Sequence, residues 1–97
     1  SIVDSLIGGG CLIEGARVEK AILSPNVKVL DQAEVKESII MEGSVIGAGA
    51  KIRRAIIDKE VVVPPVATIG YDQDLDQKRF VLTTSGIVIV PKRTKIA

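Results

Sequence analysis

The stretch IMEGSVIGAGAKIRRAII, residues 40–57, contains a regular repeat that decides the fold of the chain. Its large aliphatic residues recur at steps of six, six and five positions, at Ile40, Ile46, Ile52 and Ile57, and the residue two before each is small. An α-helix has a period of 3.6 residues and a simple strand a period of two, so neither explains this pattern. The stretch predicts short extended segments that alternate with corners.

The same spacing continues on both sides of this stretch. Large aliphatic residues five or six positions apart occur at Ile7, Ile13, Val18, Leu23, Val29, Val35, Ile40, Ile46, Ile52, Ile57, Val63 and Ile69. The residue two before each of them is Ser, Cys, Ala or Val, so one large and one small side chain can share the inner face of each segment. Three steps sum to 17 residues from Leu23 to Ile40 and again from Ile40 to Ile57, and we interpret each sum as one coil.

A six-residue repeat of this kind resembles the hexapeptide repeat, which implies a left-handed parallel β-helix with a triangular cross-section. The left hand comes from this resemblance alone, because crossovers between parallel strands are nearly always right-handed. We expect an all-β fold with about four triangular coils over residues 1–70. Residues 71–97 are expected to form a polar loop or short turn of helix and then a C-terminal β-hairpin or capping tail that packs on or flanks the last coil.

Composition limits the functions that the chain can have. With 97 residues, 46% of them hydrophobic, and only one Tyr and one Phe, it predicts one ordered unit with an aliphatic core. A net charge of +1 gives no overall attraction to nucleic acid or anionic membranes, and no apolar run or signal-peptide pattern is present, so we expect a cytoplasmic protein. Without histidine, zinc sites and His-based catalysis lack their usual groups, and Cys11, in an inward position, is expected to be buried and inert.

Residues one coil apart should stack in ladders on the three outer walls. One wall turns outward an unbroken aliphatic ladder, Leu6, Ile22, Ile39 and Ile56. A second wall alternates in charge, as a solvated surface should, through Arg17, Glu34, Lys51 and Thr68, and a third is mixed, with Leu12, Lys28, Val45 and Val62. Because an aliphatic ladder in water promotes aggregation, we predict that another subunit or domain covers it. Coverage by the tail of this chain is the alternative.

Local charge offers the candidate binding sites. The basic clusters Lys92-Arg93 with Lys95, and Arg53-Arg54, could bind a phosphorylated ligand through charge-assisted hydrogen bonds, the alternative being ordinary solvated charge. The sequence Asp58-Lys59-Glu60 has no partner carboxylate at a defined spacing, which favours a solvated corner over an acid-base pair. The segments 8–10 and 47–49 are rich in glycine but lack the context of a phosphate-binding loop, and are interpreted as corner turns.

Three segments give a closer resemblance: AIIDKEVVVPPVATIG (residues 55–70), SGIVIVPK (85–92) and SLIGGGCLIEGARVEKAILSPNVKV (5–29). Together they resemble the C-terminal domain of the bacterial ADP-glucose pyrophosphorylase family, the glucose-1-phosphate adenylyltransferases. The resemblance spans nearly all of the chain. It implies a complete enzyme that converts ATP and glucose 1-phosphate to ADP-glucose and pyrophosphate for glycogen synthesis.

The resemblance also implies different functions for two domains of the complete enzyme. The catalytic domain, which would bind Mg-ATP, is N-terminal in the family, so this fragment is expected to hold no catalytic residue and no cofactor. The β-helix is expected to pack on that domain and on another subunit of a homo-oligomer, and to help form an allosteric site for a phosphorylated activator. The basic family positions carry over to Lys59 and Lys92; a third is Ile96 here, which Lys95 could replace, and Arg93 joins this candidate anion site.

Two other functions stay open at the level of sequence. One is a hexapeptide-repeat acyltransferase that acts at a groove between subunits, although such enzymes typically use a histidine base that this chain lacks. The other is a purely structural β-helix with no ligand.

Overall fold

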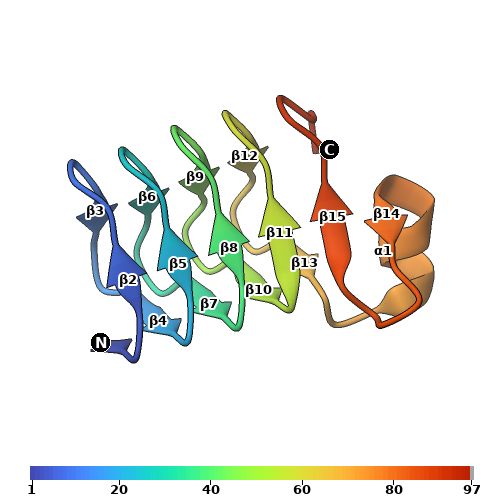
Figure 1. The fold of residues 1–97 in the computed structure, drawn as a ribbon, viewed down its shortest axis with the longest axis horizontal. Helices are drawn as coiled ribbons and strands as arrows, with labels where there is room; N and C mark the ends of the chain where they lie inside the picture. Colours follow the sequence, from blue (N-terminus) through green and yellow to red (C-terminus); the bar gives the residue numbers. More distant parts are fainter. Residues whose placement is uncertain (97) are drawn as a thin grey trace.

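The computed structural model describes residues 1–96 and confirms an all-β, left-handed parallel β-helix (Figure 1). In Figure 1 the strands β2, β5, β8 and β11 rise on the near side, and the chain then passes behind and returns to the near side one coil further along. An advance of this kind is left-handed. Three sheets, parallel except for one antiparallel strand pair near the C-terminus, form the three walls of the triangular coil.

Each wall is one sheet, named here for its outward side chains. The charged wall contains β1 (Ile2–Val3), β4 (Arg17–Glu19), β7 (Glu34–Lys36), β10 (Lys51–Arg53) and β13 (Thr68–Ile69). The aliphatic wall contains β2 (Leu6–Ile7), β5 (Ile22–Leu23), β8 (Ile39–Ile40), β11 (Ala55–Ile57), β15 (Val88–Val90) and β14 (Val81–Leu82). The mixed wall contains β3 (Leu12–Ile13), β6 (Lys28–Val29), β9 (Val45–Ile46) and β12 (Val62–Val63).

The register agrees with the 17-residue coil. Ile22 pairs with Ile39, and Ile39 with Ile56, while on the charged wall Lys51 pairs with Glu34 on one side. The inward aliphatic residues from Val18 to Ile69 are almost fully buried and form one continuous core. The large and small inward positions of the repeat therefore have the packing role that the sequence predicts.

Serine at two of the small inward positions has a second role. Ser38 Oγ accepts a hydrogen bond from the Ala55 amide at 3.1 Å and donates to the Lys36 carbonyl at 2.7 Å. Ser44 Oγ accepts from the Val61 amide at 3.1 Å and donates to the Asp58 carbonyl at 2.8 Å. These hydroxyls satisfy buried backbone groups at the corners, where the strand ladder is interrupted.

The first coil departs from the expected burial. Ile7 is 38% exposed and Ile13 is half-buried, although both occupy large inward positions. Cys11 is likewise half-buried rather than buried, and its Sγ donates to the Ser24 carbonyl at 3.2 Å. The reason is geometric, because in the described residues no complete coil stacks below the first one.

The C-terminal segment confirms the predicted hairpin and gives it a definite place. After the short helix α1 (Gln73–Arg79), β14 and β15 pair antiparallel. Strand β15 also pairs in parallel with β11, so that Val88 and Val90 extend the core and Ile89 follows Ile56 in the outward ladder. The hairpin therefore supplies one more rung of the aliphatic wall.

Candidate functional site

Lys59 and Lys92 lie at the same corner of the β-helix, one coil apart. Lys59 follows β11 and Lys92 follows β15, and these two turns are neighbours at the top of Figure 1. The Arg93 amide donates to the Lys59 carbonyl at 3.0 Å, which fixes the two turns against each other. Since adjacent coils are about 4.8 Å apart, the fold places two exposed lysines, 33 residues apart in the sequence, on neighbouring turns.

Arg93 and Lys95 differ from this pair in their contacts. Arg93 Nε lies 3.1 Å from Glu60 Oε2, an ion pair in which both side chains are exposed. Lys95 lies around the corner on the mixed wall, where its backbone forms a parallel bridge with Val62. The structure thus places all four predicted basic residues at or next to one corner, with Arg93 already paired and Lys95 set to one side.

Asp58 has a structural part in this corner. Its carboxylate accepts a hydrogen bond from the Lys59 amide at 2.6 Å, and its own amide donates to the Val90 carbonyl at 3.0 Å. An Asp that binds the backbone of its own turn is typical of corner geometry. This arrangement agrees with the interpretation of residues 58–60 as a corner rather than an acid-base pair.

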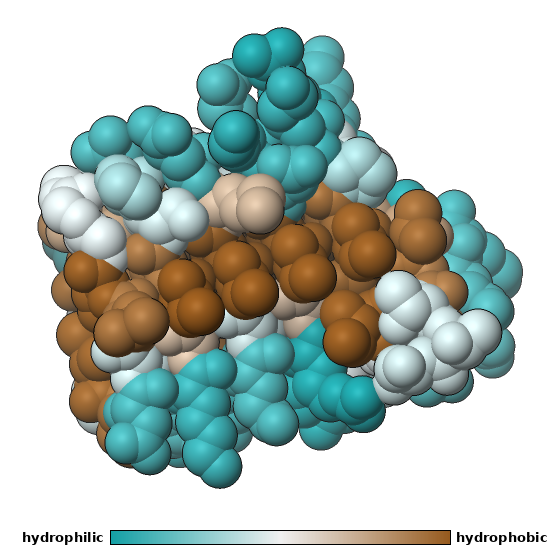
Figure 2. Space-filling view, viewed as in Figure 1, coloured by the Kyte–Doolittle hydropathy of each residue, from teal (hydrophilic) through white to brown (hydrophobic). Residues whose placement is uncertain are grey.

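The aliphatic ladder forms a continuous surface along the molecule. Figure 2 shows it as a hydrophobic stripe that crosses the near face between hydrophilic regions. Leu6 is 68% exposed and Ile22 is 42% exposed, whereas Ile39, Ile56 and Ile89 are half-buried. Within residues 1–96 the tail does not cover this stripe, because β15 extends it and the residues after Pro91 turn onto the mixed wall.

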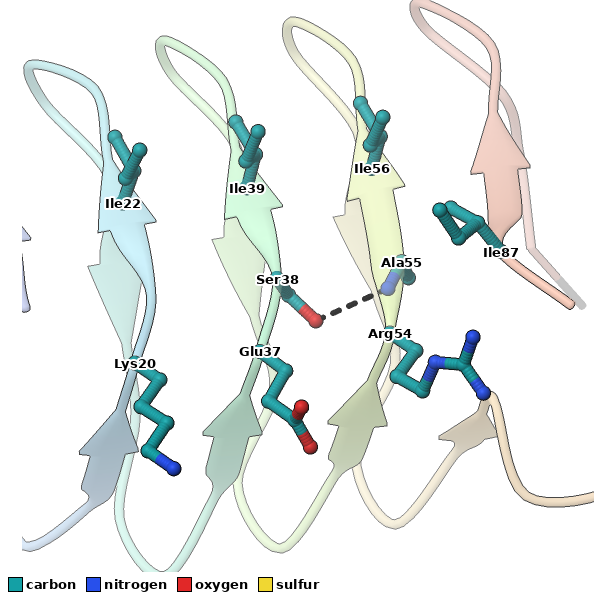
Figure 3. Close-up of a pocket in the computed structure, with 9 residues that line it drawn as sticks. All are labelled: Lys20, Ile22, Glu37, Ser38, Ile39, Arg54, Ala55, Ile56 and Ile87. Atoms are coloured by element: carbon teal, nitrogen blue, oxygen red, sulfur yellow. Dashed lines mark hydrogen bonds between the residues drawn. The ribbon is translucent and has the colours of Figure 1, made fainter. Parts of the chain in front are cut away.

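A groove of about 420 Å³ runs beside the ladder (Figure 3). Ile22, Ile39 and Ile56 line one side of it, and Ile87, from the hairpin, closes one end. Its other side is a column of charged corner residues one coil apart, Lys20, Glu37 and Arg54, each with a positive φ near 50°. The left-handed backbone at these corners turns their side chains outward beside the ladder (Figure 3).

The glycine-rich segments pack against neighbouring coils. A Cβ on Gly8 would lie 2.7 Å from the Pro25 nitrogen, and one on Gly47 would lie 2.6 Å from the Pro65 nitrogen. Both residues are glycine because the next coil passes too close for a side chain. This close approach agrees with the interpretation of the two segments as corner turns.

Sequence reasoning missed Ile87 and Ile89 as members of the apolar surface. A signal was present, because Val88-Ile89-Val90 repeats the pattern of Ala55-Ile56-Ile57 at a separation of 33 residues, close to two coils. It was obscured by the polar segment and helix between them, which leave the coil before β15 pairs directly with β11.

Residues 1–96 lack two further kinds of functional feature. They contain no group of three or more His, Cys, Asp or Glu side chains that could hold a metal ion. None of the helices in this part of the chain has the length and hydrophobicity needed to cross a membrane.

Comparison with known proteins places the chain in a family. The model of the family described as GlmU-like, C-terminal hexapeptide matches residues 1–90. Glucose-1-phosphate adenylyltransferase of Anaeromyxobacter sp. (strain Fw109-5) is 47% identical over 93 residues, which are 96% of this chain and 23% of the relative. The enzyme of the same name from Parafrankia sp. (strain EAN1pec) is 41% identical over 95 residues, 97% of this chain and 23% of the relative.

A third relative agrees with these two. Glucose-1-phosphate adenylyltransferase of Geobacter metallireducens is 43% identical over 89 residues, 91% of this chain and 22% of the relative. The chain thus spans less than a quarter of the length of these relatives. The resemblance to the C-terminal domain of glucose-1-phosphate adenylyltransferase is confirmed. The chain belongs to the GlmU-like C-terminal hexapeptide family.

Proposed function

We propose that this chain is the regulatory and oligomerisation domain of a cytoplasmic glucose-1-phosphate adenylyltransferase. In this proposal the complete enzyme converts ATP and glucose 1-phosphate to ADP-glucose and pyrophosphate, with Mg-ATP bound to a separate catalytic domain. The β-helix itself catalyses no step. The stacking of Lys59 on Lys92 at one corner is the observation that carries the regulatory part of the proposal.

The corner that carries Lys59 and Lys92, called the lysine corner from here on, suits a phosphorylated activator for electrostatic reasons. Two exposed ammonium groups about one coil apart can contact different oxygens of a phosphate group, or the two phosphates of a bisphosphate. Arg93 is paired with Glu60, whereas neither Lys59 nor Lys92 has a carboxylate oxygen within 4.0 Å among residues 1–96, and Lys95 lies to one side on the mixed wall. We therefore assign activator binding chiefly to these two lysines.

The aliphatic ladder supports the oligomerisation part of the proposal. A stripe of Leu and Ile side chains crosses the near face and is open to solvent in the single chain (Figure 2). Such a surface is favourable only when another protein surface covers it. We propose that a second subunit, or the catalytic domain of the same enzyme, packs on it.

Binding of an activator can be measured directly. Titration of fructose 1,6-bisphosphate into the complete enzyme by calorimetry is expected to show saturable binding that weakens at least about tenfold in Lys92→Ala, because a charge-assisted contact is lost. Lys36→Ala, on the charged wall, serves as the control and is expected to bind as the unchanged enzyme does. Equal affinity of Lys92→Ala and the unchanged enzyme would contradict the site.

The enzymatic part is tested by assaying two reactions. The complete enzyme is expected to form ADP-glucose from ATP and glucose 1-phosphate, whereas the 97-residue chain alone is expected to form none. The same chain is expected to transfer no acyl group from acyl-CoA to amine or alcohol acceptors. Turnover of acyl-CoA by the chain would instead favour the acyltransferase alternative.

A further inference from the structure

A second cluster of basic side chains lies at the opposite end of β11 from the lysine corner. Arg53 and Arg54 precede β11, whereas Lys59 follows it. The two arginines line a hollow of about 370 Å³ together with Glu37, Gly70, Tyr71, Gln73 and Gly86. The hollow exists because the chain leaves the coil at Gly70 and returns through the hairpin turn at Gly86, so that three separate segments surround it.

The two guanidinium groups of the hollow are held in place. Arg53 Nε and Nη2 both donate to the Gly70 carbonyl, at 3.3 and 3.2 Å, and its guanidinium lies over the Tyr71 ring at 4.3 Å from the centroid. Arg54 Nη2 donates to the Ser85 carbonyl at 2.7 Å. Each arginine is fixed through part of its guanidinium, and within residues 1–96 its remaining N–H donors have no acceptor. Fixed donors of this kind lose little conformational entropy when they bind an anion.

Side-chain nitrogens of Arg54 and Gln73 lie close to Gly86. A Cβ on this residue would lie 3.7 Å from Gln73 Nε2 and 3.8 and 3.9 Å from Nη1 and Nη2 of Arg54. Gly86 has a φ of +83°, so glycine suits the turn and also leaves the space between these donors open. Figure 3 shows that Arg54 extends away from Glu37 and toward the hairpin. A small oxyanion in this space has N–H donors of two side chains, Arg54 and Gln73, within reach.

We propose that this hollow binds the phosphate group of a small phosphorylated metabolite, or phosphate itself. Arg54 and Gln73 would donate to the phosphate oxygens, and Arg53 would supply the second positive charge beside them. Glu37, at the rim, lowers the net charge of the hollow to a single positive charge and makes the site selective for one phosphate group rather than two. This site is separate from the lysine corner and does not depend on the function proposed for it.

Titration of the ¹⁵N-labelled 97-residue chain at constant ionic strength tests the site. Inorganic phosphate and ribose 5-phosphate are the two probes, and ribose is the control for the sugar. We expect saturable shifts of the Gly86 amide and the Gln73 side-chain amide with at least one phosphate probe and none with ribose. If inorganic phosphate saturates the shifts, the free anion is sufficient as the ligand. If only ribose 5-phosphate saturates them, the ligand is a phosphate ester.

Three variants separate this site from general surface charge. Arg54→Gln is expected to weaken binding at least about tenfold, because it removes a charged donor. Lys20→Gln removes the same charge from the same column of corners, two coils away, and is expected to leave affinity within about twofold. Glu37→Gln is expected to strengthen binding several-fold, a gain that disruption of the fold cannot produce.

Three results of the titrations would overturn the proposal. They are shifts that fail to saturate up to about 10 mM probe, shifts centred on Lys59 and Lys92, or equal weakening by Arg54→Gln and Lys20→Gln. Because Arg54 also bonds the hairpin, Gln73→Glu provides a second test. Gln73 is exposed, so this variant keeps the fold while placing a negative charge beside the bound phosphate, and unchanged affinity would also overturn the proposal.

Discussion

The chain leaves the coil at Gly70, and two features of the structure require glycine at this position. Its φ is +91°, and a Cβ there would lie 1.8 Å from the Arg53 carbonyl oxygen. Gly70→Ala is therefore expected to lower the free energy of unfolding by about 3 kcal/mol or more. Urea unfolding measures the change, with Gly9→Ala as control, because a Cβ on Gly9 meets nothing within 4 Å. Equal stability of the two variants would contradict this account of Gly70.

Asp76 connects helix α1 to the last coil through buried polar contacts. Its Oδ2 accepts from the Gly70 amide at 3.0 Å, and its Oδ1 lies 3.3 Å from Arg79 Nη2, which also donates to the Thr68 carbonyl at 2.8 Å. Asp76 is 1% exposed, so Asp76→Ala leaves Arg79 with an unpaired charge in a partly buried site.

The expected cost of Asp76→Ala is about 3 kcal/mol of unfolding free energy. Asp74→Ala, on the exposed side of the same helix, is the matched control and is expected to change stability by no more than about 0.5 kcal/mol. If thermal or urea unfolding finds no difference between the two variants, the anchoring role of Asp76 is wrong.

At the scale of the element, strand β15 is the part of the wall that stacks on β11 after the regular repeat has ended. Val90 is fully buried and its carbonyl accepts from the Asp58 amide, beside the lysine corner. Val90→Ala is expected to cost roughly 1.5–3 kcal/mol, from lost burial and the cavity left behind. Val81→Ala, on the exposed edge strand β14, is the control. A Val90→Ala variant as stable as the control would show that β15 is not part of the core.

The regular elements were predictable because each inward residue is determined by spacing alone. Ile46 and Ile52 follow the period, and their strands, coils and outward neighbours lie where the period places them. The place of β15 was not predictable in this way, because its register depends on how residues 71–79 fold, and those residues carry no repeat. The residues of the hairpin predicted two strands and a turn, but they did not predict that β15 pairs with β11.

The basic sites could also be predicted only in part from the sequence. Lys59 and Lys92 were named from a family resemblance, and their proximity depends on β15 stacking on β11. The pairing of Arg93 with Glu60 could not be foreseen, because these residues are 33 positions apart and meet only through that register. The sequence named Arg53-Arg54 as a candidate binding cluster, but it did not predict the hollow, because only the fold brings Gln73 and Gly86 beside these arginines.

At the scale of the whole molecule, the aliphatic ladder predicts the effect of a charge on assembly. Ile39→Lys places an ammonium group in the middle of the stripe, where burial against a partner would cost several kcal/mol. The mass of the complete enzyme, measured by light scattering, is expected to fall. Thr68→Lys, at an outward position on the charged wall, is the control and should leave the mass unchanged. An unaltered assembly for Ile39→Lys, with its circular dichroism intact, would contradict the interface.

The proposed regulatory role is tested most directly by the kinetics of the complete enzyme carrying both Lys59→Gln and Lys92→Gln. ADP-glucose formation is measured with and without fructose 1,6-bisphosphate. We expect the unactivated rate to stay within about twofold, because the proposal assigns no catalytic step to the β-helix, and the activator concentration for half-maximal rate to rise at least about tenfold. Loss of the unactivated rate, or activation identical to that of the unchanged enzyme, would contradict the assignment of this chain as a regulatory domain.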